Sequence, residues 1–423
     1  MRFFVCVLIP LAVSAEVRTL TLRETVDIAM KQNPEIALSR LDTVKAREGI
    51  KAARDPFVPK IFGGTGFAYT DGFPNSIEGS APSIFNGKMP AMLFNKPQSY
   101  QVAVASENLR GSEIASTVRQ EDVLYRAAVL FLDAEQLARG LRTAEEQIAS
   151  LERVRETIDR RVAEGRELEI EKKRAALNVL KGRQRVENLR TDLSNVETSL
   201  ALLLGYNAED RVRAAQQERA PLELPSSEEA SITLAVDSSK ELRLIASKMA
   251  AKKLELAGYK AYRLPQVDLV AQYSMLLRRN YEDFFRRFQR NNGQVGVSVT
   301  IPILVGRSAY ANANSANADL TKLQIDFGRT RNQISADTKR AFQDIKKAEM
   351  ARDVARADLD LTREQLSIYL AQYEEGRLPL AKIEETRVAE SEHWIAYYET
   401  QNMVERARLL LLKQTGTLQA ALR

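Results

Sequence analysis

The residue types that most often do chemistry in enzymes are scarce in this sequence of 423 residues. Cys6 is the only cysteine, and His393, beside Trp394, is the only histidine. The sequence contains no phosphate-binding loop and no HExxH or GxSxG motif. Its carboxylates are spread among lysine and arginine, as on the solvated face of a coiled coil. We therefore expect a protein that is not an enzyme, with no catalytic residue, no metal site and no cofactor.

Two identical tripeptides interrupt long charged stretches that have a heptad pattern. They are Glu164-Gly165-Arg166 and Glu375-Gly376-Arg377. Glycine inside a helix costs about 1 kcal/mol relative to alanine, whereas it is common where a helix ends in a left-handed conformation. Pro379 suits the first turn of a following helix. We therefore predict that each tripeptide is a turn between two antiparallel helices.

The spacing of these turns indicates an internal repeat. A shift of 211 positions places Gly165 on Gly376 and Gly205 on Gly416 without a gap, and a shift of 206 positions relates the earlier segments. Self-similarity at a fixed offset is typical of a duplicated unit. A strict 4-3-4-3 spacing of apolar residues predicts coiled-coil helices, and in the first half it comprises Val123, Ala127, Leu130, Ala134, Leu137, Leu141, Ala144, Ile148 and Leu151.

Alternation of apolar and polar residues predicts two strands in each half. The pattern is clear at 264–275 and 293–304 and weaker at 58–69 and 83–94. Each segment is close to the length that crosses a bilayer when tilted, about 9–11 residues. Four strands leave open edges, so in a membrane several chains would have to pool their strands. The alternative is a pair of soluble hairpins.

The N-terminus and the charge limit the class of protein further. The segment 1–15, MRFFVCVLIPLAVSA, has one basic residue before a short apolar run and small residues at its end, which predicts a signal peptide. No later stretch has the apolar length of a membrane-spanning helix. The net charge of +6 is dispersed along the chain, which argues against binding of nucleic acid.

These signals divide the chain into two halves with the same order of elements. At about 1.5 Å per residue, each long helix would extend about 100 Å. The expected bounds are signal peptide 1–15; first repeat 16–205, with helix 22–54, strands 58–69 and 83–94, long helix 98–163, turn 164–168 and return helix 170–204; linker 206–227; second repeat 228–416, with helix 228–262, strands 264–275 and 293–304, long helix 307–375, turn 375–379 and return helix 379–415; and tail 417–423.

The order and spacing of these features resemble the TolC family of outer-membrane efflux channels over about residues 20–417. The features that carry the resemblance are the opening LTLRETVDIAMKQNPEI, the segment VSVTIPILVGR at 297–307 and the two Glu-Gly-Arg turns. The resemblance implies a mainly α chain with a small β part. Its long antiparallel helices would form an α-barrel, and its four strands would join a trimeric 12-stranded transmembrane β-barrel.

The resemblance also implies a function. A homotrimer in the outer membrane, extending into the periplasm, would passively conduct substrates exported by an inner-membrane transporter through a periplasmic adaptor. The turn residues Glu164, Gly165, Arg166, Glu375, Gly376 and Arg377 would dock the adaptor. Loops 70–82 and 276–292 would face outside, and the second, rich in arginine and aromatic residues, is either solvated or in contact with outer-membrane lipid. The competing hypothesis is a soluble periplasmic coiled-coil scaffold without a pore.

In the family, acidic residues a few positions after the turn glycine form rings that narrow the tube. The matching positions here are Glu171 in the first half and Lys382 and Glu385 in the second. A lysine thus replaces one expected acid. Our hypothesis is a mixed-charge periplasmic gate held by Lys382–Glu385 pairs between protomers. The alternative is that these side chains pair along their own helices.

Overall fold

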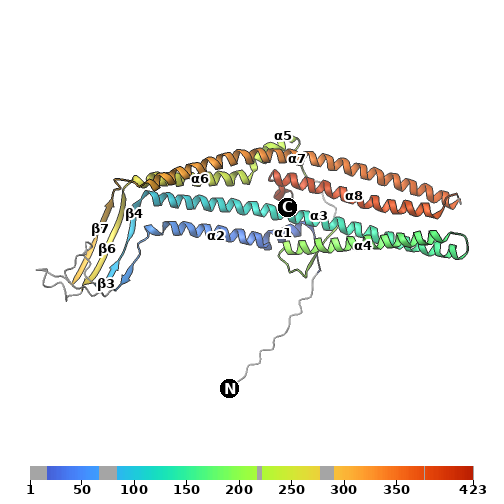
Figure 1. Cartoon of the computed structure of the whole chain (residues 1–423), viewed down its shortest axis with the longest axis horizontal. Coiled ribbons are helices and arrows are strands. Elements are labelled where there is room, and N and C mark those ends of the chain that lie inside the picture. Colours follow the sequence, from blue (N-terminus) through green and yellow to red (C-terminus); the bar gives the residue numbers. More distant parts are fainter. Residues whose placement is uncertain (1–16, 66–82, 217–221, 277–289, 376, 423) are drawn as a thin grey trace, which may run out of the picture. The chain divides into compact units, whose positions relative to one another are not determined.

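The structure is a computed structural model that describes residues 17–65, 83–216, 222–276, 290–375 and 377–422 (Figure 1). The predicted signal peptide, Gly376, the loop 70–82 and most of the loop 276–292 lie outside these residues. The described chain is mainly helical with a small β part, as predicted. None of its helices combines the length and the apolar character that crossing a membrane requires.

The chain forms two compact units that do not coincide with the two predicted repeats. Unit 1 comprises Met1–Ser39, Ser116–Lys240 and Arg331–Arg423, and unit 2 comprises Arg40–Ala115 and Glu241–Thr330. Each unit therefore takes segments from both halves of the sequence. The halves do not fold as separate bodies, because segments of one half pack against segments of the other within each unit.

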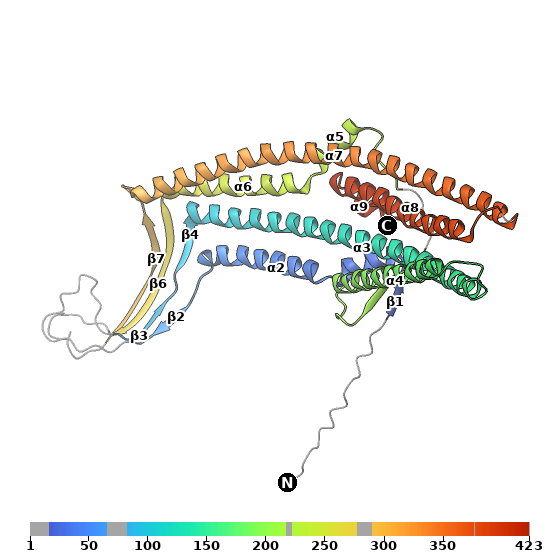
Figure 2. The same cartoon turned by 45° about the vertical axis from the view of Figure 1, so that its right-hand side comes forward.

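Unit 2 contains a sheet in which one strand position is shared by two short strands (Figures 1 and 2). β3 and β4 both pair antiparallel with β6, β3 along Gln272–Leu276 and β4 along Gln266–Leu269. β2 pairs with β3, and β7 pairs with the other side of β6. The strands are β2 (Phe62–Gly64), β3 (Ser83–Lys88), β4 (Ala91–Asn95), β6 (Gln266–Leu276) and β7 (Asn291–Thr300).

The strand predictions of the second half agree with the structure better than those of the first. The single strand expected over 83–94 is wrong, because Pro90, which has no N–H to donate, lies between β3 and β4. In the segment 58–69 only Phe62–Gly64 is described as a strand, and 66–69 lie outside the described residues. β7 ends at Thr300, two residues before Pro302, and not at 304.

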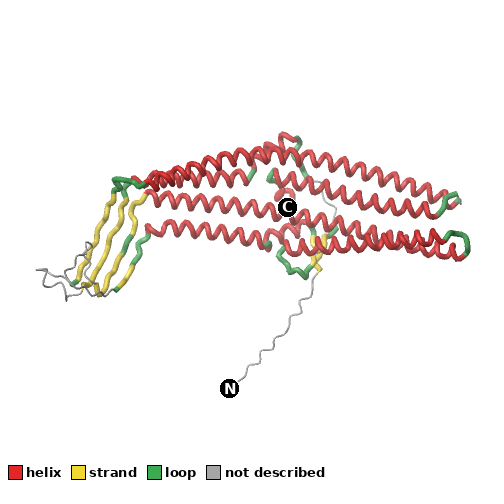
Figure 3. The backbone as a smooth tube through the Cα atoms, in the orientation of Figure 1, coloured by secondary structure: helices red, strands yellow, loops and turns green. Residues whose placement is uncertain are grey.

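Four helices make up most of the described chain (Figure 3). α3 and α7 are long, and α4 and α8 return antiparallel to them after the two turns. The predicted coiled-coil seam of α3 lies in the core of unit 1, where Val123, Ala127 and Ala134 are buried around Phe131. The bounds are α3 (Lys96–Ala163), α4 (Glu169–Leu203), α7 (Arg307–Glu374), α8 (Leu380–Gln414) and the short α9 (Leu418–Ala421), which occupies the predicted tail.

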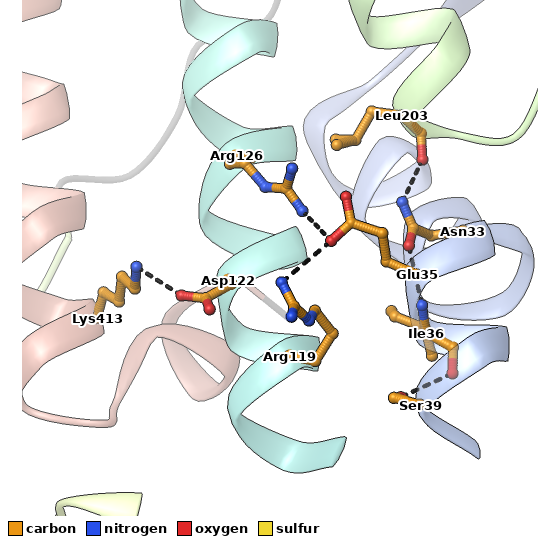
Figure 4. A network of polar contacts seen from close by, with 9 residues as sticks. All are labelled: Asn33, Glu35, Ile36, Ser39, Arg119, Asp122, Arg126, Leu203 and Lys413. Atoms are coloured by element: carbon orange, nitrogen blue, oxygen red, sulfur yellow. Dashed lines mark hydrogen bonds and ion pairs between the residues drawn. The ribbon is translucent and has the colours of Figure 1, made fainter. Parts of the chain in front are cut away.

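The expected helix 22–54 is divided into α1 (Leu22–Gln32) and α2 (Pro34–Arg54). Pro34 cannot continue the hydrogen-bond ladder of α1 but suits the first position of α2. The Asn33 side chain accepts a hydrogen bond from the Ile36 N–H at 3.1 Å and donates one to the Leu203 carbonyl at 2.6 Å (Figure 4). The break at Asn33, which forms the joint between α1 and α2, is therefore held to the end of the return helix α4 by a hydrogen bond.

Ion pairs hold the same joint against α3. Glu35, in the first turn of α2, accepts from Arg126 at 2.7 Å and from Arg119 at 3.4 Å, both of α3 (Figure 4). A separate pair, Asp122 with Lys413 at 2.7 Å, joins α3 to α8 (Figure 4). These side chains are partly exposed, so each pair contributes only a fraction of a kcal/mol, up to about 1. The pairs of Glu35 connect the start of α2 to α3.

The second half has a corresponding joint at Ser239, which was not predicted from the sequence. The expected helix 228–262 is divided into α5 (Glu228–Ser238) and α6 (Lys240–Lys260), followed by the 3₁₀ turn η2 (Ala261–Arg263). The Ser238 hydroxyl donates to the Thr415 carbonyl at 2.8 Å, at the end of α8. Gly205 and Gly416, which end α4 and α8, both have a positive φ, of 86° and 71°.

The predicted linker 206–227 contains a strand that the sequence analysis did not expect. β5 (Arg211–Ala214) pairs in parallel with β1 (Val17–Leu20), with Val17 opposite Arg211. Val212 and Ala214 alternate toward the core of unit 1 and are buried there. Four residues are too few for period-two alternation to distinguish a strand from a loop in sequence alone.

Candidate functional site

The turn between α3 and α4 closes with a Schellman motif. Gly165 has φ 70°, its N–H donates to the Val162 carbonyl at 2.9 Å, and the Arg166 N–H donates to the Arg161 carbonyl at 2.8 Å. This pair of hydrogen bonds satisfies carbonyls that the helix end would otherwise leave free. The turn between α7 and α8 has the equivalent of the Arg166–Arg161 hydrogen bond, which runs from the Arg377 N–H to the Gln372 carbonyl at 2.9 Å. Gly376 lies outside the described residues.

The two turns present the same charged side chains to solvent. Arg166 pairs with Glu164 at 3.3 Å, and Arg377 pairs with Glu375 at 3.1 Å. Each arginine side chain is 77% exposed. Ion pairs this exposed contribute little to stability, so the arginines remain available to a partner. Both turns belong to unit 1.

The gate candidates form pairs within their own helices. Lys382 pairs with Glu385 at 2.8 Å, and Glu171 pairs with Arg174 at 2.7 Å, each three residues further along the helix. The hydrogen bond with Glu385 raises the pKa of the Lys382 ammonium above its ordinary value, so the lysine is charged at neutral pH. Glu171 therefore pairs on α4, and Lys382 and Glu385 pair with each other on α8. Pairing along one helix is what the alternative hypothesis expects; pairing between protomers stays a hypothesis.

Contacts between the two helical hairpins lie just behind the turns. The Arg161 guanidinium of α3 donates to the Tyr373 hydroxyl of α7 at 2.8 Å. The Arg387 guanidinium of α8 donates to the Ser150 hydroxyl of α3 at 3.1 Å. These contacts were not predictable from the sequence, because no spacing rule connects side chains more than 200 positions apart.

Glu384 is a buried acid beside the gate candidates. It is 4% exposed, and neither carboxylate oxygen has a hydrogen-bond partner among the described residues. Burial raises the pKa of its carboxyl, and the positive charge of Arg387, whose nearest nitrogen is 3.6 Å away, opposes this. Residue type gave no sign of this burial, because glutamate is normally solvated and the adjacent Glu385 is exposed.

Glu384→Gln is expected to stabilise the protein at neutral pH. A carboxyl whose folded-state pKa lies above its unfolded value destabilises the fold above that folded pKa, and the penalty is lost as the pH falls through it. At pH 7 the free energy of unfolding of the variant should exceed that of the parent by about 1 kcal/mol or more, and its unfolding temperature should rise accordingly. Near pH 4 the two proteins should be equally stable. Calorimetry at both pH values measures this. Glu385→Gln, on the exposed neighbour, is the control, and a gain that persists at low pH would contradict the account.

Two helices of unit 1 carry apolar side chains that are exposed to solvent in the single chain. On α7, Val354, Leu361 and Ile368 repeat every seven residues and are 58%, 55% and 48% exposed. On α4, Ile170 and Leu177 have the same spacing and are 55% and 50% exposed. A heptad of apolar residues on an exposed helix face is typical of a surface that packs against another helix.

The sheet of unit 2 also has surfaces that the single chain does not cover. Every residue of β7 is exposed, and Val295, Val297 and Val299 on one face are 84%, 60% and 60% exposed. β7, β2 and β4 each pair with a single strand, so each has one side unpaired within the described sheet. A long, apolar, unpaired edge is a template for pairing with another chain.

The described residues contain no group of three or more His, Cys, Asp or Glu side chains placed to hold a metal ion. The arrangement consists instead of charged turns, exposed apolar heptads and open strand edges. Features of this kind are typical of surfaces that bind other protein chains.

Comparison of the sequence with models of known protein families gives no match, and comparison with curated proteins gives none either. Solved structures do match over nearly the whole chain. The CmeC outer membrane channel of Campylobacter jejuni has a TM-score of 0.77 at 14% identity, covering 94% of this chain and 86% of that one. CusC, whose structures concern folding and transmembrane channel formation, has a TM-score of 0.78 at 12% identity. That match covers 93% of this chain and 92% of CusC.

The MtrE outer membrane channel of Neisseria gonorrhoeae, in its open state, has a TM-score of 0.74 at 14% identity, covering 94% of this chain and 89% of that one. The likeness thus spans the helical hairpins and the sheet and leaves little of either chain unmatched. At these identities the agreement concerns the backbone and not particular side chains. The chain has the fold of the TolC-like outer-membrane channels.

Proposed function

We propose that the protein is an outer-membrane efflux channel that extends into the periplasm and passively conducts substrates to the outside. The observation that carries this proposal is the fold, shared with outer membrane channels over 93–94% of this chain. The strands of unit 2 would supply part of a transmembrane β-barrel, and the long helices would supply part of a tube.

The proposed active form is a homotrimer. A single chain leaves one side each of β2, β4 and β7 unpaired, and a closed ring of copies would give these sides partner strands from the neighbouring copies. The exposed heptads of α4 and α7 support the same assembly, because neighbouring copies would cover them. The competing scaffold hypothesis gives no partner to the exposed valines of β7.

Membrane extraction tests the proposal. The protein is expected in the outer-membrane fraction, released only by detergent, and to migrate on a gel as a trimer before heating and as a monomer after it. Recovery of the full chain from the soluble periplasm without detergent would support the scaffold hypothesis and contradict the channel.

We propose further that the two turns dock a periplasmic adaptor linked to an inner-membrane transporter. The support is the exposure of Arg166 and Arg377 in the same geometry at both turns. An acidic or polar surface on the adaptor would complement them.

Gly165→Pro is expected to weaken adaptor binding at least about tenfold while the trimer stays intact. Proline fixes φ near −65°, whereas Gly165 has φ 70°, and proline removes the N–H that donates to Val162. Pull-down of the adaptor by the purified trimer measures this. Gly165→Ala keeps the N–H and meets no atom within 4 Å, so it carries only the conformational cost of the positive φ and serves as the control. Full adaptor binding by the proline variant would exclude this turn as the docking surface.

We also propose a mixed-charge gate formed by Lys382 and Glu385. If Lys382 and Glu385 pairs between protomers hold a constriction, Lys382→Ala is expected to raise the closed-state leak and shift ion selectivity toward cations. Single-channel recording of the variant and the parent measures both quantities. Arg174→Ala, which removes the partner of Glu171, is the control. Unchanged leak and selectivity would leave the pairs as helix-surface contacts only.

A further inference from the structure

A cavity of about 340 Å³ lies in unit 2 between the first turns of α3 and the last turns of α6. Three tyrosines line it, Tyr100 from α3, Tyr259 from α6 and Tyr262 from η2. Glu255 is the only charged residue among the lining residues. An aromatic wall with a single carboxylate is the arrangement that recognises an organic cation.

Two of the three tyrosine rings stack on each other, and one of these two is partly exposed. Tyr259 and Tyr262 stack with centroids 6.4 Å apart and planes 15° apart, and Tyr262 is 39% exposed. Gly258 permits the approach of Tyr100, because a Cβ at that glycine would lie 3.2 Å from the Tyr100 Cβ. The Lys96 ammonium lies 5.4 Å from the centroid of the Tyr100 ring, so one ring of the cavity already receives a cation.

The carboxylate of the cavity is held in place by its neighbours. One oxygen of Glu255 accepts from the Tyr259 hydroxyl at 3.2 Å, and the other pairs with Lys252 at 2.8 Å. Lys252 also pairs with Asp319 at 3.4 Å, and its ammonium is not among the lining groups. Burial, together with the charge of Glu255, raises the pKa of the Tyr259 phenol, so this hydroxyl stays protonated and continues to donate.

We propose that this cavity binds an alkylammonium group against Tyr100, Tyr259 and Tyr262, with Glu255 supplying the opposite charge. Two sources present this group, the headgroup of an ethanolamine lipid and a free organic cation. α3 begins at Lys96, directly after β4, so the cavity adjoins the sheet. The proposal goes beyond the channel function, because it concerns binding by a single chain and holds whether or not the protein conducts.

Titration of the purified full-length protein with tetramethylammonium tests the proposal by calorimetry. Saturable binding is expected, and Tyr262→Leu and Glu255→Gln should each weaken it by roughly fivefold. Tyr262→Phe keeps the ring and should leave the affinity unchanged. Lys96→Met removes the ammonium that competes for the Tyr100 ring and should tighten binding. Absence of saturable binding, or binding that Tyr262→Leu and Glu255→Gln leave unchanged, would overturn the proposal.

The source of the group is distinguished by native mass spectrometry of the protein extracted with lipid. Preferential retention of phosphatidylethanolamine over phosphatidylglycerol, lost in Tyr262→Leu, supports a headgroup site. Tetramethylammonium binding without such a preference supports a site for a soluble cation. Failure of both, in a protein that still forms channels in a bilayer, would refute this inference and leave the channel function standing.

Discussion

Gly205→Ala is expected to destabilise the protein by about 2–4 kcal/mol. Gly205 has φ 86°, a conformation that costs an L-residue about 1–2 kcal/mol. A Cβ there would also lie 2.8 Å from the Gln32 carbonyl oxygen, which belongs to the backbone and cannot rotate away. The substitution would therefore force α4 away from the joint between α1 and α2.

Two other glycines provide matched controls, because they share the positive φ but differ in their surroundings. A Cβ at Gly165 meets nothing within 4 Å, so only the conformational cost remains, about 1–2 kcal/mol. A Cβ at Gly416 meets the Ser238 hydroxyl at 3.1 Å, a side chain that can shift, so an intermediate loss is expected. Thermal unfolding of the three alanine variants measures the order. Equal losses at Gly205 and Gly165 would show that the close approach at the joint is absent.

Leu361→Glu is expected to abolish the trimer while each chain keeps its fold. Leu361 is 55% exposed in the single chain, so a glutamate there costs the monomer little. In a trimer the same position would be covered by a neighbouring helix, and burial of an unpaired carboxylate costs several kcal/mol at each of three interfaces. Light scattering in detergent would then report a monomer, and circular dichroism would report unchanged helix content.

Arg356→Glu is the matched control for this prediction. It introduces the same side chain on the same helix, but Arg356 lies outside the Val354, Leu361 and Ile368 heptad and is 70% exposed beside Asp360. The control should remain a trimer. A trimer that persists in Leu361→Glu would show that the exposed heptad of α7 is not an interface between copies.

Periodic features were predictable from the sequence, and local exceptions to them were not. The seam through Val123 and Ala127 and the turn at Gly165 followed from heptad spacing and from the conformational freedom of glycine. The joint at Asn33 was missed because apolar spacing continues across it. The Asn33-Pro34 dipeptide was a usable signal, since proline favours the first position of a new helix. The joint at Ser239 offers no such signal.

Pairings between distant segments were beyond the reach of sequence patterns. β1 and β5 are four residues each and are strands because they pair with each other. The Arg161–Tyr373 contact and the burial of Glu384 depend on how α3, α7 and α8 pack, which spacing rules within one helix do not describe. The Lys382–Glu385 pair, by contrast, lies three residues apart on one helix, a separation at which side chains meet, and was foreseen as an alternative.

Conductance of the purified protein in a planar lipid bilayer tests the central claim most directly. The account predicts discrete, uniform current steps from the detergent-extracted trimer and none from the Leu361→Glu monomer at the same protein concentration. A folded trimer that inserts into the bilayer and carries no current, or equal currents from the trimer and the monomer, would contradict the assignment of a trimeric channel.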